Sequence, residues 1–303
     1  MAKIYNALLL LAEILFLILK IFYFILTIFI PRTKKSVIDE IVLITGAGHG
    51  IGKELAIGYA TLGATVVCWD INEETNNRTM NEIKMMGKNN IYAYKCNVAD
   101  RKEVFKVAEK VRKEVGDVTI LVNNAGILII KKLLNQSADE ITRVIDVNLI
   151  SHYWTLQAFL PNMIEKNRGH VVAVSSLVAY KGATHGTVYC PTKSAIKVLM
   201  EAVNDELRTC SKGKSLIKFT TVYPTLVLTG FDKNKTRIRF PSILRKLTPQ
   251  KAASLIIDAQ RQNFKERTIP SDYQLILYLM RIFPNKIFWC VYNFIGFGVD
   301  EEN

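Results

Sequence analysis

The chain has 303 residues, half of them hydrophobic, and its 40 basic and 27 acidic side chains give a formal net charge of +13. Such a charge is common in nucleic-acid-binding proteins, but neither a Lys/Arg-rich helix with interleaved aromatic residues nor a recognisable binding motif accompanies it, so no nucleic acid is expected as a partner. The five cysteines are odd in number and lack Cys-x-x-Cys spacing, which indicates neither a zinc site nor a disulfide framework and fits a reducing compartment.

The first predicted element is an apolar segment from Ala7 to Ile30, interrupted only by Glu13 and Lys20. A helix of these 24 residues would reach roughly 36 Å at about 1.5 Å per residue, which is enough to cross a bilayer. The segment ends in Pro-Arg-Thr-Lys-Lys, so residues 1–36 are predicted to be a retained hydrophobic membrane anchor with a basic flank. Because Glu13 and Lys20 lie on nearly the same helical face, an interfacial hairpin or a tilted helix stays open as an alternative to a simple span.

The charges that flank this apolar segment are asymmetric. Lys3 stands alone before it, whereas Arg32, Lys34 and Lys35 follow it directly. The positive-inside rule places the more basic flank in the cytosol. The remainder of the chain is therefore predicted to face the cytosol.

A glycine-rich stretch follows the first strand-like run, Ile41–Ile44, and leads into a helical stretch from Gly50 to Leu62. Glycines let the backbone turn tightly and approach a pyrophosphate closely, and the N–H groups of the helix's first turn bind the anion with help from the helix dipole. The order strand, glycine turn, helix predicts a dinucleotide-binding loop. Its predicted cofactor-binding residues are Gly46, Gly48, His49, Gly50, Ile51 and Gly52.

The second strand-like run, Thr65 to Trp69, ends at Asp70, which lies 18 residues after Gly52, where an acid that binds the ribose of a dinucleotide is expected. A carboxylate there accepts hydrogen bonds from both ribose hydroxyls and repels the additional phosphate of NADP, so NAD is the predicted cofactor. Two alternatives stay open. Asp70 can be only a strand-end turn or a helix cap, and the basic residues His49 and Lys53 can help to hold a 2′-phosphate.

Apolar strand-like runs recur along the chain with helix-length segments between them. This alternation predicts an α/β fold, a Rossmann-type doubly wound parallel sheet with helices on both faces. No linker is apparent within it, so residues 37–270 are predicted to form a single domain. The runs are Val66–Trp69, Ile91–Tyr94, Ile120–Val122, Val171–Val174 and Phe219–Val222.

Three polar side chains follow the strand predicted from Val171 to Ser175. Ser176 comes directly after it, and Tyr189 and Lys193 are four residues apart, so both project from one face of the next helix. A tyrosine titrates near about 10, so its use as a base requires the phenolate to be favoured by about two or three pKa units, to which Lys193 and a positively charged nicotinamide ring can contribute. Ser176 would orient the substrate oxygen. The structural alternatives are a helix cap for Ser176, a half-buried aromatic for Tyr189 and a surface charge for Lys193.

These motifs together resemble the short-chain dehydrogenase/reductase family over residues 38–265. The resemblance implies that Asn148, Ser176, Tyr189 and Lys193 are catalytic, with Asn148 at a helix kink that supports a proton-relaying water. It also implies that Asn124, Ala125 and Gly126 line the cofactor site and that Tyr189 and Lys193 contact the cofactor. The motifs, in the family's order, are Thr45-Gly-x-x-x-Gly50-x-Gly52, Asn123-Asn124-Ala125-Gly126, Asn148, Ser176 and Tyr189-x-x-x-Lys193.

The same resemblance implies two further cofactor contacts. The adenine-contacting position, usually aspartate in the family, is Asn97-Val98 in this chain, and an amide can still hydrogen-bond the ring. The segment from Pro224 to Thr229 matches the one that contacts the nicotinamide carboxamide, with Thr225 where the family usually has glycine. Since the family usually dimerises, a homodimer is expected.

More narrowly, the apolar N-terminus and the stretches Ile41–Gly52 and Val115–Gly126 resemble the membrane-associated branch that contains 17-beta-hydroxysteroid dehydrogenases types 11 and 13 and epidermal retinol dehydrogenase 2. This resemblance implies an NAD-dependent dehydrogenase that interconverts a lipophilic alcohol and its carbonyl at the endoplasmic reticulum membrane or on lipid droplets. Retinol and retinal are the predicted pair. The alternatives are a 17-beta-hydroxysteroid dehydrogenase and a lipid-droplet scaffold with residual cofactor binding.

The C-terminal segment 271–303 is predicted to associate with the membrane or with an interface. The stretch from Tyr273 to Gly298 is dense in large apolar residues and broken by Pro284, which suits an apolar surface helix beside the active site. A role in dimer packing or in the core is the alternative. Before it lies a basic cluster that either meets anionic lipid headgroups or is merely solvated. The cluster comprises Lys233, Lys235, Arg237, Arg239, Arg245 and Lys246.

Overall fold

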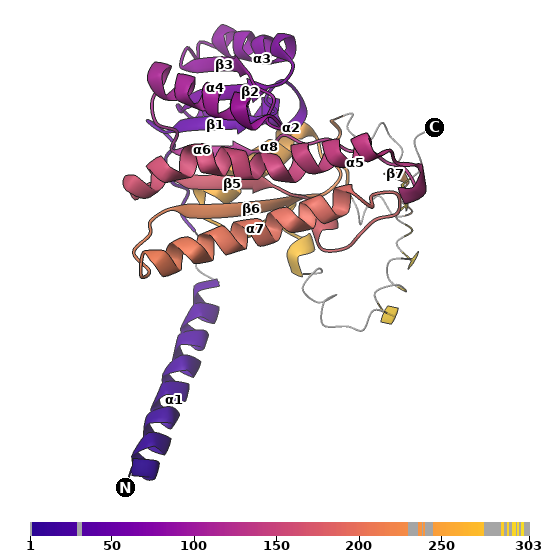
Figure 1. Cartoon of the computed structure of the whole chain (residues 1–303). Helices are drawn as coiled ribbons and strands as arrows, with labels where there is room; N and C mark the ends of the chain where they lie inside the picture. The colour runs from indigo at the N-terminus through magenta and orange to yellow at the C-terminus, as the bar shows by residue number, and fades with distance from the viewer. Residues whose placement is uncertain are drawn as a thin grey trace. The chain divides into compact units, whose positions relative to one another are not determined.

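Figure 1 shows a computed structural model of the chain. The structure describes residues 2–28, 32–229, 236–237, 239, 245–275, 286–287, 290, 293–294, 296 and 298–299. The chain divides into two compact units, Met1–Lys35 and Ser36–Asn303.

The described part of the first unit contains the helix α1 (Ala2–Ile28). Every side chain described along it is exposed, including Leu11 at 68 %, Phe16 at 60 % and Tyr23 at 63 %. The ammonium of Lys20 lies 4.3 Å from the centre of the Phe16 ring, so this charge rests on an aromatic face. Among the helices within the described residues, none combines the length and the apolar character needed to cross a membrane.

The second unit is built on a seven-stranded sheet in the order β3-β2-β1-β4-β5-β6-β8, in which all neighbouring strands are parallel. The chain winds outward from β1 in one direction and from β4 in the other, which opens a crevice at the carboxyl ends of these two strands. The predicted α/β fold with a parallel sheet is confirmed. The strands are β1 (Ile41–Thr45), β2 (Thr65–Asp70), β3 (Ile91–Lys95), β4 (Ile120–Asn123), β5 (His170–Val174), β6 (Lys218–Pro224) and β8 (Glu266–Ile269).

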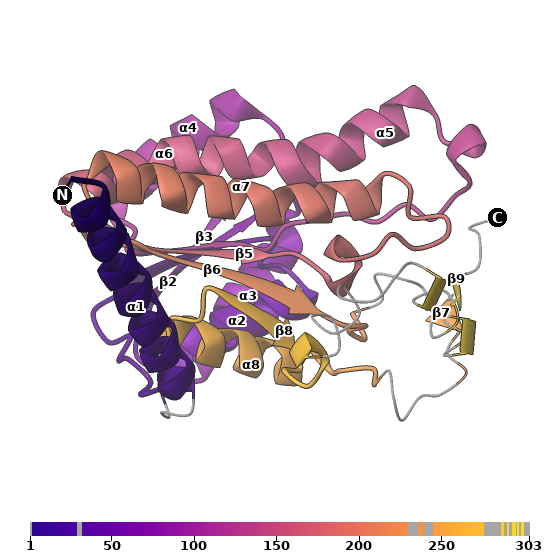
Figure 2. The ribbon, with the colours of Figure 1, turned by 90° about the horizontal axis from the view of Figure 1, so that it is seen from below.

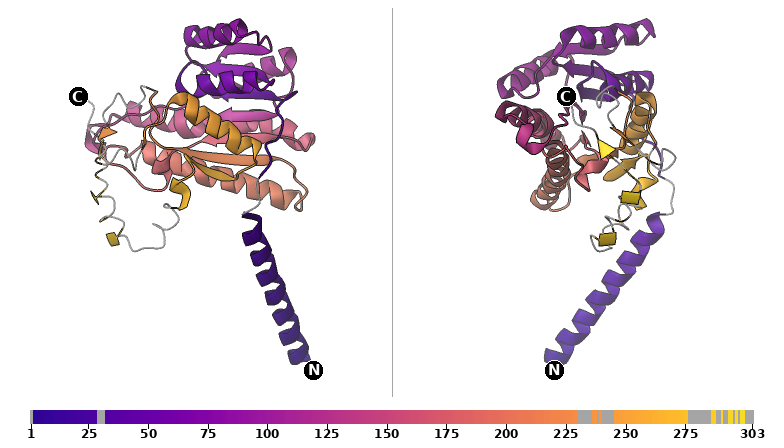
Figure 3. Two further views of the ribbon diagram at one scale, coloured as in Figure 1. Left: turned by 180° about the vertical axis from the view of Figure 1, so that it is seen from behind. Right: turned by 90° about the vertical axis from the view of Figure 1, so that its right-hand side faces the viewer.

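Helices cover both faces of the sheet (Figure 2), as a doubly wound fold requires. One face carries α4 (Arg101–Glu114), α6 (Ser151–Glu165) and α7 (Tyr189–Cys210). The other carries α2 (Gly50–Thr61), α3 (Glu73–Met85) and α8 (Pro249–Arg261), the last of which is seen in front of the sheet in the left view of Figure 3. Short elements complete the fold: η1 (Leu133–Asn135), α5 (Ala138–Ile145), the π-helical turn η2 (Asp146–Ile150) and η3 (Leu177–Ala179).

Strand side chains alternate between two cores, one under each layer of helices. In β1, Val42 and Ile44 pack toward α2 and α8, whereas Leu43 packs toward α4, α6 and α7, and all three are fully buried. A strand buried on both faces is a continuous apolar run in the sequence. This is why the central strands were recognisable from the sequence.

The edge strand β8 was not predicted, because its sequence Glu-Arg-Thr-Ile begins with two charged residues and only Thr268 and Ile269 are buried. Four residues of the predicted basic cluster lie within the described residues, namely Arg237, Arg239, Arg245 and Lys246, whereas the apolar stretch from Tyr273 to Gly298 lies largely outside them. Their described parts include a short antiparallel pair, β7 (Thr236–Arg237) with β9 (Gly298–Val299).

Candidate active site

A cavity of about 360 Å³ lies at the carboxyl ends of the strands, lined by segments that follow or end β1 to β6. This is the crevice that the strand order predicts. Gly48, Gly52 and Asn148 are the predicted site residues that do not line it. Those that do are Gly46, His49, Gly50, Ile51, Asp70, Asn97, Val98, Asn124, Ala125, Gly126, Ser176, Tyr189, Lys193, Pro224 and Thr229.

The glycine loop between β1 and α2 depends on the absence of side chains. Gly46 and Gly50 have φ of +69° and +57°, in the left-handed region that favours glycine. A Cβ on Gly52 would lie 2.0 Å from the carbonyl oxygen of Gly46, and one on Gly48 would lie 2.4 Å from Thr75 Oγ1. The N-cap side chain, His49, makes no capping hydrogen bond to α2. The first turn of α2 therefore keeps backbone donors for an anion.

Asp70 ties this loop to the end of β2. Its Oδ2 accepts a hydrogen bond from the Gly48 N–H (2.8 Å) and its Oδ1 one from the Asn72 N–H (2.9 Å), while the residue is only 6 % exposed. The turn-forming role left open for Asp70 is therefore present, and the carboxylate also lines the cavity. Lys53, an alternative partner for a 2′-phosphate, is paired instead with Glu82 at 2.7 Å.

Thr45 and Asn124 join the ends of β1 and β4. Thr45 Oγ1 accepts from the backbone N–H groups of Asn124 and Ala125, both at 3.0 Å. Asn124 Nδ2 donates to the carbonyl oxygens of Thr45 (2.9 Å) and Gly46 (3.3 Å). The hydroxyl and the amide together fix the glycine loop against the neighbouring strand at the floor of the crevice.

Asn148 lies in the π-helical turn η2 and is fully buried. Its Oδ1 accepts from the Ile127 N–H (2.8 Å), and its Nδ2 donates to the Ile127 carbonyl (2.9 Å). The Asn148 side chain thus bonds both backbone groups of Ile127, as a neighbouring strand would, and fixes the segment that follows β4. The proton-relaying role expected for this position stays a prediction.

Ser176, Tyr189 and Lys193 meet at one end of the cavity. The Ser176 and Tyr189 side chains are hydrogen-bonded, and Lys193 Nζ lies 5.6 Å from the centre of the Tyr189 ring. Ser176 Oγ also accepts from the Val178 N–H at 3.4 Å, so it caps η3 as well. Lys193 is 4 % exposed and donates to the Val174 carbonyl at 3.0 Å, which rules out a surface charge.

Burial shifts the titration of both groups toward the neutral state. It raises the pKa of Tyr189 well above its ordinary value, with the neighbouring Cys190 adding to the rise and the hydrogen bond from Ser176 opposing it. Burial also lowers the pKa of Lys193 to about 8. The free cleft therefore holds a protonated phenol beside an ammonium that is still mostly charged at neutral pH.

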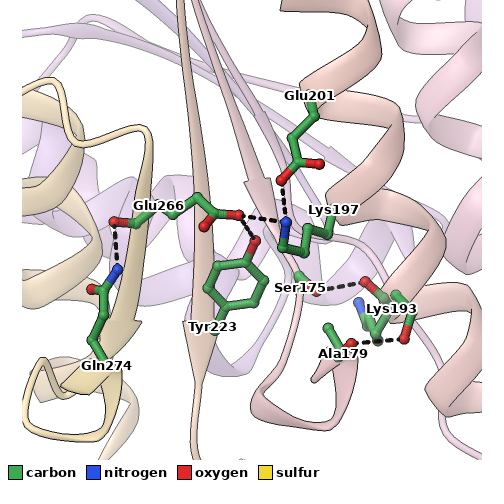
Figure 4. A network of polar contacts seen from close by, with 9 residues as sticks. Ser175, Ala179, Lys193, Lys197, Glu201, Tyr223, Glu266 and Gln274 are labelled. Atoms are coloured by element: carbon green, nitrogen blue, oxygen red, sulfur yellow. Dashed lines mark hydrogen bonds and ion pairs between the residues drawn. The ribbon is translucent and has the colours of Figure 1, made fainter. Parts of the chain in front are cut away.

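A polar cluster lies beside the part of α7 that carries Lys193 (Figure 4). Tyr223, at the end of β6, donates to Glu266 Oε1 at 2.6 Å, and the same oxygen lies 3.2 Å from the ammonium of Lys197. Lys197 also pairs with Glu201, and it is one helical turn beyond Lys193. The ring of Tyr180, just after η3, packs edge-on against Tyr223 with centres 4.7 Å apart. These contacts join β6, β8, η3 and α7 around the candidate active site.

The apolar wall of the cavity was not predicted as part of the site. Its side chains follow β4, lie in η3 or follow β6, and the apolar run directly after Asn-Asn-Ala-Gly is the sequence signal for those that follow β4. This wall gives the cavity an apolar surface in addition to its polar side chains. Its members are Ile127, Leu128, Ile130, Val178, Leu226 and Val227.

Fold and site define a dinucleotide-dependent oxidoreductase: a doubly wound sheet, a glycine cradle without side chains, and a Ser-Tyr-Lys group in the same crevice. The family model described as short chain dehydrogenase matches residues 40–239. The chain belongs to this short-chain dehydrogenase family and is an oxidoreductase that acts on CH–OH groups.

The chain is similar to several named members of this family over most of its length. It is 38 % identical to short-chain dehydrogenase/reductase family 16C member 6 of Bos taurus, over 92 % of this chain and 88 % of that protein. It is 39 % identical to epidermal retinol dehydrogenase 2 of Mus musculus (88 % and 85 % covered). It is 37 % identical to 17-beta-hydroxysteroid dehydrogenase 13 of Homo sapiens (90 % and 90 % covered). The predicted family and branch are confirmed.

Two solved structures share the fold. A short-chain dehydrogenase/reductase from Burkholderia phymatum in complex with NAD has a TM-score of 0.72 at 23 % identity, covering 81 % of this chain and 94 % of that one. A metagenomic short-chain oxidoreductase in complex with NADP has a TM-score of 0.64 at 25 % identity, covering 77 % and 97 %. One of these two structures thus holds NAD and the other NADP.

Proposed function

We propose that this protein is a membrane-attached, NAD-dependent dehydrogenase that interconverts a lipophilic alcohol and its carbonyl compound, with retinol and retinal as the leading pair. The observation that carries this proposal is the cavity in which Ser176, Tyr189 and Lys193 meet an apolar wall. A 17-beta-hydroxysteroid is the second candidate. Relatives with both names support a substrate of this kind.

The glycine loop, Asp70 and the ends of β3, β4 and β6 are proposed to hold the cofactor. Gly46, Gly48 and Gly52 leave room for a pyrophosphate over the first turn of α2. Asp70 supports NAD, since its carboxylate would repel a 2′-phosphate and Lys53 is engaged by Glu82. The proposed contacts beyond the loop are Asn97, Val98, Asn124, Ala125, Gly126, Tyr189, Lys193, Pro224 and Thr229.

The side chains of the cleft are proposed to transfer the proton. A bound nicotinamide dinucleotide supplies the oxidation, as acceptor of the hydride from the alcohol carbon. Ser176 donates a hydrogen bond to the substrate oxygen, and Tyr189 takes its proton. Because burial raises the pKa of Tyr189, the phenolate needs positive charge nearby, and the Lys193 ammonium provides it. Asn148 is proposed to support the proton path to Lys193.

Membrane attachment is proposed to act through residues 1–36, which contain α1 and a basic flank, at an insertion depth that is left open. The side chains described along α1 are all exposed, and a lipid phase would cover the apolar ones. The endoplasmic reticulum or a lipid droplet, with residues 37–270 facing the cytosol, is the proposed location. A homodimer is the proposed assembly, and segment 271–303 is proposed to lie at the membrane or at an interface.

The proposal is tested with membranes that contain the full chain, supplied with all-trans-retinol or a 17β-hydroxysteroid and with NAD or NADP. Chromatography follows the aldehyde or ketone product. We expect NAD-dependent retinal formation that is lost in Tyr189→Phe. A preference for NADP would overturn the proposed role of Asp70, and steroid oxidation alone would replace retinol by the second candidate.

A scaffold that only binds the cofactor is the outcome that would contradict an enzymatic role. It predicts cofactor binding without product from any lipid alcohol, and no difference between the wild type and Tyr189→Phe. The orientation of the domain can be measured separately, because Asn-x-Ser/Thr sequons begin at Asn77, Asn135 and Asn234. A cytosolic domain would carry no glycan there, and a shift in mobility after glycosidase treatment would contradict that placement.

A further inference from the structure

The loop between β4 and α5 presents two leucines to solvent on η1. Leu134 is 95 % exposed and Leu133 is 54 % exposed. Leu134 is the most exposed of the large hydrophobic side chains that the structure describes. Single exposed leucines need no explanation, but two adjacent ones at the tip of a loop make a small apolar point.

This apolar point continues into the wall of the cavity. The same loop carries Ile127, Leu128 and Ile130, which line the cavity and are buried or half-buried. Ile130 is 3 % exposed and lies three residues before Leu133, a separation of at most about 10 Å of chain. One stretch of backbone thus joins the proposed substrate pocket to the exposed leucines.

The tip is held in place by contacts on both sides. The Lys131 N–H donates to the His185 carbonyl at 3.3 Å, and Gln136 Nε2 donates to the Lys131 carbonyl (2.9 Å) and to Thr187 Oγ1 (3.1 Å). Lys131 is also paired with Glu140, the acid of the capping box that starts α5. The two loops that frame the cavity are therefore fastened together, and the exposure of the leucines is part of the folded arrangement.

The chain is basic directly before the leucines. Lys131 and Lys132 precede them, and Lys131 is the residue paired with Glu140. Paired apolar and basic side chains suit the boundary of an anionic phospholipid surface, where leucine enters the acyl region and lysine meets the phosphates.

We propose that Leu133 and Leu134 insert into a phospholipid surface and that this contact holds the loop that lines the cavity against the lipid from which the substrate comes. This inference rests on the proposed function for the identity of the substrate. Two leucines are far too little area for a stable protein–protein interface, which needs about 1,000 Å² or more. A lipid surface needs no matching shape, so a small apolar tip with basic neighbours is sufficient for it.

Depth-dependent fluorescence quenching tests the contact without any use of activity. The full chain is reconstituted into vesicles containing phosphatidylserine and lipids with brominated acyl chains, as Leu134→Trp or as Met85→Trp. Met85 ends α3, is 82 % exposed and is a matched control for an exposed apolar position elsewhere on the domain. After subtraction of wild-type emission, we expect at least about twofold stronger quenching at position 134 than at position 85. Equal quenching would overturn the proposal.

A second copy of the chain is the competing occupant of this tip. If the emission of Leu134→Trp shifts with protein concentration in lipid-free detergent and is not quenched in vesicles, the tip is a protein interface and the proposal is wrong. Removal of phosphatidylserine should weaken the quenching, because the lysines lose their anionic partners.

Turnover measurements on two kinds of alcohol distinguish a failure of the lipid contact from a failure of the proposed function. The double substitution Leu133→Ser with Leu134→Ser should slow oxidation of vesicle-borne retinol roughly tenfold at limiting substrate, while oxidation of a short water-soluble alcohol and the Met85→Ser control should be unchanged. Equal loss on both alcohols would contradict a role in lipid delivery. Selective quenching in a chain that oxidises no alcohol would leave the membrane contact intact and overturn the proposed function.

Discussion

The two halves of the crevice differ in the groups that form them. The half at β1 and β2 is made of backbone: glycines that leave no room for a Cβ, N–H groups at the start of α2, and one carboxylate that ties the loop to its strand. The half at β5 and α7 is made of side chains, with Ser176, Tyr189 and Lys193 gathered at an apolar wall. Cofactor binding by the first half should be lost when a side chain is added to a glycine. Turnover by the second half should be lost when a polar group is removed from a side chain.

The largest effect on cofactor binding is expected at Gly52, where an added methyl group has no space. In Gly52→Ala, the Cβ would lie 2.0 Å from the Gly46 carbonyl oxygen and 2.6 Å from Asn124 Nδ2, so the loop must leave its position. We expect NADH binding, followed by fluorescence titration, to weaken at least about 100-fold. Gly182→Ala is the matched control, because a Cβ there meets nothing within 4 Å. Wild-type affinity in Gly52→Ala would show that the loop does not depend on this close approach.

Removal of the Ser176 hydroxyl from the side-chain half should lower the turnover rate and leave NADH binding unchanged. Ser176→Ala deletes the hydroxyl bonded to Tyr189 and proposed to orient the substrate oxygen. We expect kcat to fall about 10²-fold, since the loss of one positioned donor has effects of about 10²- to 10³-fold. The dissociation constant of NADH should stay within about twofold of the wild type. An equal loss of affinity and rate would mean that the halves are not separable.

The side-chain half also contains a buried histidine whose titration should be visible in stability. Burial and then the charge of Lys193 lower the pKa of His152 to about 3 from its ordinary value of 6.5. Below pH 6.5 the His152 imidazole therefore binds a proton in the unfolded chain and not in the folded chain. The free energy of unfolding decreases as the pH falls from 6.5 toward 3. By pH 5 this amounts to about 2 kcal/mol.

Urea unfolding at pH 8 and pH 5 checks this difference. In His152→Gln the drop in unfolding free energy between the two pH values should be smaller than in the wild type by about 2 kcal/mol, because glutamine does not titrate. Identical drops in both proteins would show that His152 titrates normally.

The smallest effect is expected at Asp70, where one negative charge is removed from the backbone half. Asp70→Asn keeps an acceptor for only one of the two backbone N–H groups, those of Gly48 and Asn72, and it loses the repulsion of a 2′-phosphate. We expect the ratio of kcat/KM with NADP to that with NAD to rise roughly tenfold, which corresponds to about 1.4 kcal/mol. The control is Glu82→Gln, which releases Lys53 without touching Asp70. A larger gain in NADP use from that control would move the selectivity to Lys53.

The two halves also differ in how far the sequence predicts them. The glycine loop and the central strands follow from local chemistry: apolar runs buried on both faces, then a turn that only glycine permits. Ser176, Tyr189 and Lys193 were found through spacing and family resemblance, and the structure brings them together. The polar edge strand β8 gave no apolar signal, and the π-helical turn at Asn148 has no periodic pattern that marks it.

Contacts made between distant segments could not be predicted. The pairing of Lys197 with Glu266 and Tyr223 joins residues far apart in the chain, and each alone resembles a surface or core residue. Thr45 was recognised as part of a motif, but its hydrogen bonds to Asn124 and Ala125 depend on the pairing of β1 with β4.

The role of Tyr189 is tested most directly by measuring cofactor binding and turnover on the same Tyr189→Phe protein. We expect NADH affinity within about threefold of the wild type, because the backbone half is untouched, together with loss of retinol oxidation by about 10³-fold or more, because the proton acceptor is gone. Retained turnover in a chain that still binds NADH would contradict the assignment of Tyr189 as the group that takes the proton.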